Sequence, residues 1–135
     1  MSRQNVEIVR AHIEAFRAED TERSASFCDP HIVWEVSRLG IPELSTATYG
    51  IEAIVQGVVR WVGAFEGYDY EVESLADLGS GQVLAVITEV GRGKGSGAPV
   101  GRSYAVLYTV IASKIVRITA FSSAEEAREA VGAWE

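Results

Sequence analysis

Four side chains in this sequence could move a proton or polarise a carbonyl group: His12, Glu35, Tyr104 and Tyr108. A histidine or a carboxylate can take up a proton near neutral pH, and a phenol can donate a hydrogen bond to a developing oxyanion. Strand alternation places Tyr104, Val106 and Tyr108 on one face. If the protein is an enzyme, we predict that Tyr104 or Tyr108 polarises a carbonyl group, and that Glu35 or His12 transfers the proton.

A set of apolar and aromatic residues could surround these groups and contact a ligand. It comprises Trp34, Tyr49, Trp61, Val106, Ile118 and Ala120. The alternative is that these residues and the two tyrosines only fill a core, although each buried hydroxyl then needs a polar partner. His12 has two interpretations as well. It is a partly buried histidine hydrogen-bonded at a helix edge, or a titratable group at the mouth of a pocket.

Three β-rich runs between residues 81 and 121 form the centre of the predicted fold. They cover residues 83–90, 102–111 and 115–121, and β-branched and aromatic residues dominate each of them. Glycine-rich or short turn segments separate the runs. Few polar residues interrupt them, so both faces of the sheet are expected to be covered.

The rest of the chain supplies helices and two further strands. Apolar residues at helical spacing predict helices over residues 2–19 and 51–66. A short helix is expected to end near Phe27, before a break at Asp29-Pro30, and a last helix to follow Ser123. Strands are expected at residues 32–36 and 68–76, with a loop over 38–49. Helices segregated from a mostly antiparallel sheet make a single α+β domain over residues 1–135.

Composition excludes several classes of function. A net charge of −7 without a basic cluster argues against nucleic acid. No apolar run is long enough to span a membrane and no signal peptide is evident, so we expect a cytoplasmic protein. The single cysteine, Cys28, is expected to be a buried, inert thiol. His12, His31 and Cys28 lack the spacing of a zinc site, so no metal is expected.

Two common site motifs fail on context. The glycines between residues 91 and 97 lie between two strands, whereas a dinucleotide-binding loop requires a strand before it and a helix after it. Gly95-Ser96-Gly97 lies in the same hairpin and not on the strand-to-helix turn of a serine hydrolase. No cofactor is therefore expected.

Several short motifs together resemble the SnoaL-like proteins of the nuclear transport factor 2-like superfamily. They are Asn5-Val6-Glu7-Ile8-Val9-Arg10, Ala15-Phe16, Tyr49-Gly50-Ile51-Glu52-Ala53, Trp61 with Phe65, the glycines of 91–97, Lys114-Ile115-Val116-Arg117 and Glu125-Glu126-Ala127. The resemblance covers nearly the whole chain. It implies a cystatin-like cone, in which a strongly curved, mostly antiparallel sheet wraps around three to four helices and encloses an apolar pocket.

The resemblance also implies a range of chemistries and a partner. Its members include polyketide cyclases, ketosteroid isomerases, limonene epoxide hydrolases and dehydratases, and they usually form homodimers through the outer sheet face. Alternation puts Ala105, Leu107, Thr109, Thr119 and Phe121 on that face, and an apolar face of this size is expected to be covered by a second copy.

The usual acid and base positions of the family correspond to residues that cannot transfer protons. The histidine and aspartate of the cyclases correspond to Val106 and Ala120, and a frequent acidic residue at the last helix corresponds to Ser123. We predict a homodimer that binds a small apolar molecule, with isomerase, cyclase or lyase chemistry if it is an enzyme. The alternative is a non-catalytic binding or assembly module whose cone is largely filled.

Overall fold

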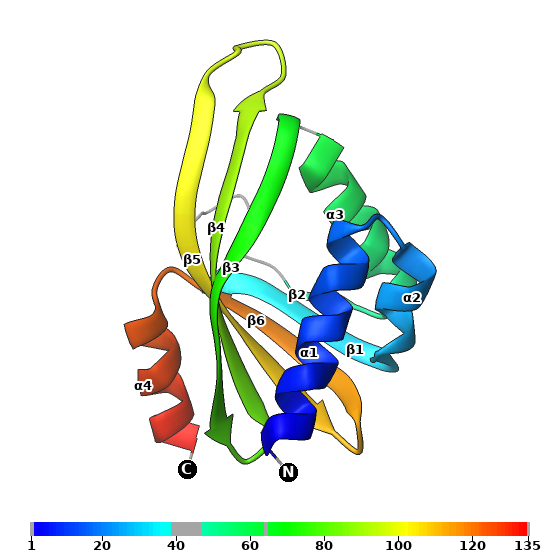
Figure 1. The fold of residues 1–135 in the computed structure, drawn as a ribbon, viewed down its shortest axis with the longest axis vertical. Coiled ribbons are helices and arrows are strands. Elements are labelled where there is room, and N and C mark those ends of the chain that lie inside the picture. Colours follow the sequence, from blue (N-terminus) through cyan, green and yellow to red (C-terminus); the bar gives the residue numbers. More distant parts are fainter. Residues whose placement is uncertain (1, 39–46, 64, 135) are drawn as a thin grey trace.

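The computed structural model describes residues 2–38, 47–63 and 65–134, which form four helices and six strands (Figure 1). In chain order these are α1 (Ser2–Arg17), α2 (Thr21–Ser26), β1 (Cys28–Arg38), β2 (Ala47–Tyr49), α3 (Ile51–Gly63), β3 (Phe65–Gly79), β4 (Gln82–Gly93), β5 (Pro99–Ile111), β6 (Lys114–Phe121) and α4 (Ala124–Trp134). Among the described helices, none has the length and apolar character needed to cross a bilayer.

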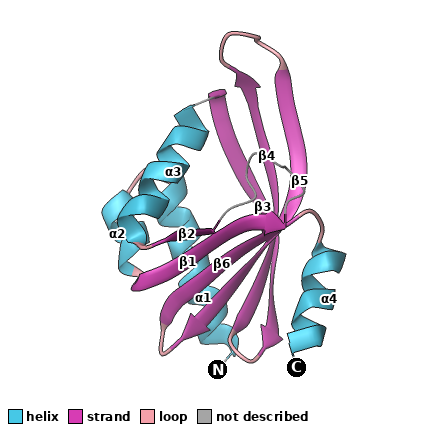
Figure 2. Cartoon of the chain, turned by 180° about the vertical axis from the view of Figure 1, so that it is seen from behind, coloured by secondary structure: helices cyan, strands magenta, loops and turns pink. Residues whose placement is uncertain are grey.

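One sheet contains all six strands, in the order β2-β1-β6-β5-β4-β3. The β1–β6 pair is parallel and the other pairs are antiparallel, which confirms a mostly antiparallel sheet. The long strands bend so that the sheet curls around α1, α2 and α3, while α4 lies on the other face (Figures 1 and 2). This is the predicted α+β cone.

Most differences from the predicted elements concern strand length. β1 begins at Cys28 and so runs through Asp29-Pro30, where a break was predicted. Its pairing with β6 shifts register between Cys28 and Val33, and proline is tolerated in such irregular strand segments. β3, β4 and β5 also extend beyond the predicted runs, because β4 and β5 remain paired almost to the tip of their hairpin.

The inner face of the sheet packs against the first three helices. Val9 and Ile13 of α1 are buried there with residues of every long strand, and Ile51 and Ile54 of α3 pack against the same cluster. Burial of these apolar side chains is the main stabilising contribution. The helices cover the sheet and leave a hollow beneath them, which holds the candidate site.

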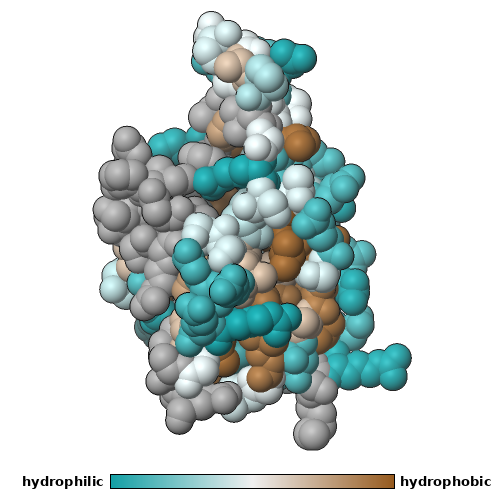
Figure 3. Space-filling view, turned by 90° about the vertical axis from the view of Figure 1, so that its left-hand side faces the viewer, coloured by the Kyte–Doolittle hydropathy of each residue, from teal (hydrophilic) through white to brown (hydrophobic). Residues whose placement is uncertain are grey.

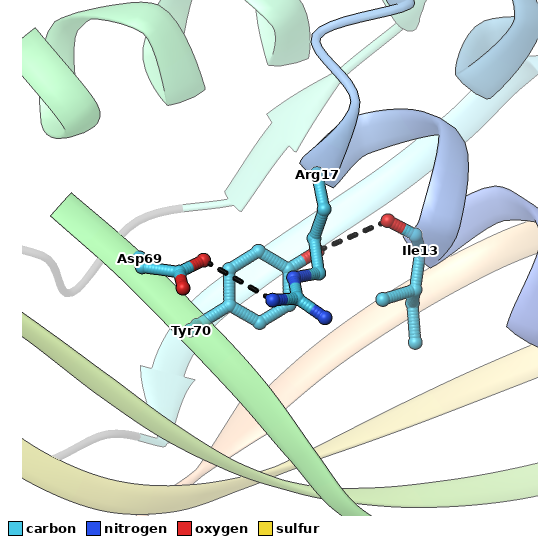
Figure 4. A network of polar contacts seen from close by, with 4 residues as sticks. All are labelled: Ile13, Arg17, Asp69 and Tyr70. Carbon is cyan, nitrogen blue, oxygen red and sulfur yellow. Dashed lines mark hydrogen bonds and ion pairs between the residues drawn. The ribbon is translucent and has the colours of Figure 1, made fainter.

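Polar contacts fix the C-terminal part of α1 to β3 (Figure 4). The Tyr70 hydroxyl donates a hydrogen bond to the Ile13 carbonyl oxygen over 3.5 Å. Arg17 pairs with Asp69 over 3.4 Å, and its guanidinium lies 5.8 Å from the centre of the Tyr70 ring. The exposed ion pair contributes little energy, but together these contacts set the position of the helix that carries His12.

The outer sheet face is not the open apolar surface that the sequence suggested. Helix α4 packs on it, and Ala127 and Val131 form a second core with Leu84, Ala105, Leu107 and Phe121. Thr119 is buried as well, with 1% of its surface exposed. Figure 3, a view of this side, shows apolar surface interrupted by many polar side chains. The chain therefore covers much of this face itself, so burial of the face does not require a second copy, and the dimer remains a prediction.

Candidate functional site

A cavity of about 510 Å³ lies between the inner sheet face and helices α1 to α3. This volume is in the range of pockets that take small organic molecules. Most of the lining is apolar, from Ile32, Trp34, Ile51, Ile54, Val55, Val58, Ile87, Val106, Ile118 and Ala120. The filled-cone alternative predicted no space larger than a water molecule, so this volume counts against it.

Helix α3 closely approaches the sheet at the aromatic wall of the cavity. A methyl group built on Gly57 would lie 3.4 Å from the Trp34 ring, at ordinary contact distance. Trp34 reaches this position because it alternates with Glu35 along β1 and faces inward. The indole therefore forms part of a rigid apolar surface against which a flat ligand could pack.

His12 lies at one polar end of the cavity, and its tautomer follows from its hydrogen bonds. Its Nδ1 atom lies 2.9 Å from the carbonyl oxygen of Ser24. A carbonyl oxygen can only accept, so Nδ1 carries the proton and donates it. The Nε2 atom is then the basic nitrogen. Within the described residues Nε2 has no hydrogen-bond partner and is not a fully buried unsatisfied atom, and His12 lines the cavity.

Burial keeps the imidazole neutral. Desolvation lowers the pKa of His12 below its ordinary value of 6.5, and the hydrogen bond to Ser24 opposes this shift only in part. The Ser24 hydroxyl, itself buried, donates to the main-chain carbonyl of His12 over 3.3 Å. The α1–α2 contact thus holds both the position and the protonation state of this histidine.

Tyr108 lies against His12 and is a hydrogen-bond donor at neutral pH. The two rings meet edge to face, with centroids 5.9 Å apart. Burial raises the pKa of Tyr108 well above its ordinary value, and neighbouring Tyr70 and Tyr104 add to the effect. Its hydroxyl has no hydrogen-bond partner among the described residues and is not a fully buried unsatisfied atom, and Tyr108 lines the cavity as well.

Cys28 lies beside this pair and is half-buried, and the inertness of its thiol remains a prediction. Burial raises its pKa to about 11, although the charge of Lys114 acts in the opposite direction. The Sγ atom lies 3.8 Å from His12 Nδ1 and 3.7 Å from the Ser24 carbonyl oxygen. A protonated thiol is a poor nucleophile, so Cys28 contributes a weakly polar wall and no covalent chemistry.

A second polar end, which we call the Glu89 cluster, consists of Tyr68, Glu89, Arg102 and Tyr104. The Glu89 carboxylate is 2% exposed and accepts hydrogen bonds from the Tyr68 hydroxyl (2.7 Å) and from Arg102 Nε (2.8 Å). The Arg102 guanidinium lies 5.2 Å from the centre of the Tyr104 ring. Burial, and next the charge of Glu89, raise the pKa of Tyr104.

Sequence reasoning missed Tyr68, Glu89 and Arg102, although a signal existed. Arg102 continues the alternation of Tyr104, Val106 and Tyr108, and Glu89 continues that of Ala85 and Ile87. Glu89 and Arg102 face each other directly in the β4–β5 register. Opposite charges at inward positions of paired strands are the mark of a buried ion pair.

The structure brings together most of the predicted site residues and separates two of them. His12, Trp34, Tyr104, Val106, Tyr108, Ile118 and Ala120 line the cavity. Glu35 does not, because it alternates with Trp34 and pairs on the outer face with Arg117 over 2.8 Å. Tyr49 is 69% exposed and lines a separate shallow hollow beside the start of α3. Trp61 belongs to α3, but its side chain lies outside the described part of the structure.

The sequence of this chain matches a known protein family. A family model for the SnoaL-like domain matches residues 9–118. The chain belongs to the SnoaL-like family. No curated protein sequence matches this SnoaL-like chain significantly.

Solved structures share the fold of this SnoaL-like protein across nearly its whole length. An NTF2-like protein from Burkholderia thailandensis is 25% identical, with a TM-score of 0.78 and coverage of 94% of this chain and 96% of that one. TerC, co-crystallised with polyporic acid, is 17% identical, with a TM-score of 0.76 and coverage of 93% and 96%. An LEH-like epoxide hydrolase from M. tuberculosis is 15% identical, with a TM-score of 0.68 and coverage of 89% and 83%.

The position that corresponds to a frequent acidic residue in relatives has a structural role in this SnoaL-like chain. The Ser123 hydroxyl accepts a hydrogen bond from the backbone N–H of Glu126 over 3.2 Å, as an N-cap of α4 does. Ser123 therefore starts the helix that covers the outer face. It takes no part in the cavity.

The lowered pKa of His12 predicts how the stability of this SnoaL-like protein depends on pH. Above pH 6.5 the histidine is neutral in both the folded and the unfolded chain. As the pH falls below 6.5, the unfolded chain binds a proton that the folded chain does not, so the free energy of unfolding decreases until the folded pKa is reached. Urea unfolding of the wild type and of His12→Asn between pH 5 and 7.5 measures this difference.

The asparagine variant is expected to lose the His12 part of this slope, because its amide can still donate to Ser24 but does not titrate. His31→Asn is the matched control, since His31 is exposed. It is expected to keep the wild-type slope. Identical slopes in the wild type and His12→Asn would contradict a buried neutral imidazole.

Proposed function

We propose that this SnoaL-like protein binds a small, largely apolar carbonyl compound in its cavity and catalyses proton transfer beside the carbonyl group. Isomerase, cyclase or lyase chemistry can follow from this step without a metal or nucleotide. One observation carries the proposal. His12 and Tyr108 line the same cavity with their rings in contact, and neither the basic nitrogen of His12 nor the hydroxyl of Tyr108 has a hydrogen-bond partner among the described residues.

The chemistry divides between these two residues. The Tyr108 hydroxyl donates a hydrogen bond to the carbonyl oxygen of the ligand, and His12 Nε2 takes a proton from the neighbouring carbon. As the C–H bond breaks, its electron pair forms a carbon–carbon double bond and the oxygen gains negative charge. The hydrogen bond from Tyr108 stabilises this charge in a site of low dielectric constant. In a ligand with a carbon–carbon double bond next to that carbon, the negative charge extends over the double bond, and return of the proton from the imidazolium to its far carbon completes an isomerisation.

The states of both groups at neutral pH fit these roles. The lowered pKa of His12 keeps Nε2 unprotonated and able to act as a base. The raised pKa of Tyr108 keeps its hydroxyl protonated and able to donate. The family positions that hold acid and base in the cyclases are Val106 and Ala120, which form apolar wall here. The proposed chemistry therefore uses a different pair of residues.

Deuterium exchange tests the proposal. The apolar bicyclic ketone beta-tetralone is incubated with the protein in heavy water, and loss of its proton signals beside the carbonyl is followed by NMR. Binding of the same ketone is measured by calorimetry. We expect binding and an exchange rate clearly above that of buffer.

Ala120→Phe serves as the blocked variant, because Ala120 is 3% exposed and lines the cavity. It is expected to lose both binding and exchange, with folding checked by circular dichroism. Ala53→Phe, on the exposed side of α3, is the matched control and is expected to retain both. Binding without exchange would refute the proposed catalysis, and absence of binding would refute the whole proposal.

A further inference from the structure

The Glu89 cluster contains an ion pair, Glu89 with Arg102, inside a mostly apolar cavity. Stability of the fold alone gives little reason for this pair. Apolar residues of similar volume in place of a buried ion pair are often neutral or stabilising, because both charges must be removed from water. Glu89 is 2% exposed and Arg102 is 29% exposed on the cavity side of the sheet. This end of the cavity is therefore suited to a polar part of a ligand.

The charges of the buried and half-buried side chains that line the described part of the cavity sum to zero at neutral pH, and the remaining charged lining residue, Arg60, is exposed on α3. The Glu89 carboxylate and the Arg102 guanidinium compensate each other over 2.8 Å. Burial holds Tyr70, Tyr104 and Tyr108 protonated, Cys28 as a thiol and His12 neutral. An ionised group of a ligand in the buried part of the cavity, among these side chains, would lose its hydration without gaining a net opposite charge, which is unfavourable.

The two polar ends are separated along one strand. Tyr108 belongs to the His12 end and Tyr104 to the Glu89 cluster, with Val106 between them on the same face of β5. Four residues of extended strand span about 13 Å. Apolar residues line the space between the two polar ends. A ligand that reaches both ends must therefore be elongated and apolar in its middle.

We propose that the cavity recognises an uncharged, elongated apolar molecule with a hydroxyl or carbonyl group at each end. One group binds at His12 and Tyr108, and the other binds at the Glu89 cluster, which acts as a recognition site and takes no part in proton transfer. The inference rests on the proposed function for the first end and adds a specificity site at the second. An apolar ligand with one polar group would satisfy the first end alone.

Three biphenyl probes test, in calorimetric titrations at pH 7, whether the second polar group of a ligand adds affinity and whether the ligand must be uncharged. They are para-phenylphenol with one hydroxyl, para,para′-biphenol with one at each end, and the acid in which one hydroxyl of the biphenol is replaced by a carboxylate. We expect the biphenol to bind roughly fivefold to tenfold more tightly than the phenol, as one additional hydrogen bond implies. The carboxylate is expected to bind more weakly than either.

A double variant locates the effect. Glu89→Met with Arg102→Met removes both charges together, and the advantage of the biphenol over the phenol is expected to disappear while binding of the phenol is retained. Glu35→Met with Arg117→Met is the matched control, because that ion pair has the same 2.8 Å separation but lies on the outer face. It is expected to keep the wild-type preference for the biphenol.

Each other result has a distinct meaning. If the wild type binds the phenol but gains nothing from the second hydroxyl, the specificity site is refuted and the proposed function stands. Tighter binding of the carboxylate refutes the requirement for an uncharged ligand. If the charge-free double variant keeps the preference, the site lies elsewhere. Failure of all three probes to bind the wild type counts against the proposed function as well.

Discussion

The variant His12→Asn is expected to lower the exchange rate of beta-tetralone by roughly 10²- to 10⁴-fold, the usual contribution of a positioned general base. The asparagine amide can still donate to the Ser24 carbonyl oxygen, which His12 Nδ1 contacts over 2.9 Å. What the variant lacks is the basic Nε2 atom. Ketone binding should therefore change little, since the apolar walls are intact.

The pH profile of exchange distinguishes a base from a residue that only supports the structure. In the wild type the rate is expected to decrease at acid pH through a pKa below 6.5, because burial lowers the pKa of His12 and protonation removes the base. His31→Asn replaces an exposed histidine and is expected to leave both rate and profile unchanged. Equal rates for the wild type and His12→Asn would exclude His12 as the base.

The single variant Arg102→Met is expected to lower the free energy of unfolding by about 3–5 kcal/mol. It removes the positive charge that lies 2.8 Å from the carboxylate of Glu89, a residue with 2% of its surface exposed. A buried carboxylate that loses this charge must be desolvated without it or become protonated. Urea unfolding at pH 7 measures the loss.

Removing the carboxylate as well is expected to recover most of this stability. Glu89→Met with Arg102→Met leaves no charge to desolvate, and the stability should return to within about 1 kcal/mol of the wild type. The outer pair provides a comparison, because Arg117 is 42% exposed and Arg117→Met should cost less than about 1 kcal/mol. A small loss for Arg102→Met, equal to that for Arg117→Met, would show that the inner pair is effectively solvated.

Much of the fold can be predicted from the sequence, because periodicity records which faces are buried. The runs at residues 83–90, 102–111 and 115–121 correspond to β4, β5 and β6, and the helix predicted over residues 51–66 corresponds to α3, although α3 ends at Gly63 and β3 already begins at Phe65. The length of the β4–β5 hairpin was underestimated because glycines read as turn residues. Gly91 and Gly93 are within β4, where Gly91 allows the Phe65 side chain of β3 to approach closely.

The outer face shows what local patterns cannot reveal. Alternation correctly placed Ala105, Leu107 and Phe121 opposite the cavity, but it cannot say which element covers them. The short helix α4 does so with Ala127 and Val131, two small side chains that carry a weak signal in a polar helix. Docking of a helix on a sheet is a long-range choice, and the sequence of either element alone does not determine it.

The candidate site was predicted in part for the same reason. Residues on β5 and β6 were placed correctly because strand alternation is strict, whereas Glu35, a candidate for proton transfer, pairs with Arg117 on the outer face of β1. Adjacent residues of a strand point to opposite faces, so Glu35 and Trp34 could not both line the cavity. The contact of His12 with Ser24 joins two helices and depends on tertiary packing that helical periodicity does not encode.

Strand β5 has a consequence for how proteins of this shape can diverge. Its even-numbered residues 104, 106 and 108 line the cavity, while its odd-numbered residues 105 and 107 pack under α4 in a separate core. Substitutions at residues 104, 106 and 108 alter which ligands fit the cavity. Substitutions at residues 105 and 107 alter the stability of the packing between the sheet and α4. Selection for a new ligand and selection for a stable frame can therefore act on alternate residues of a single strand.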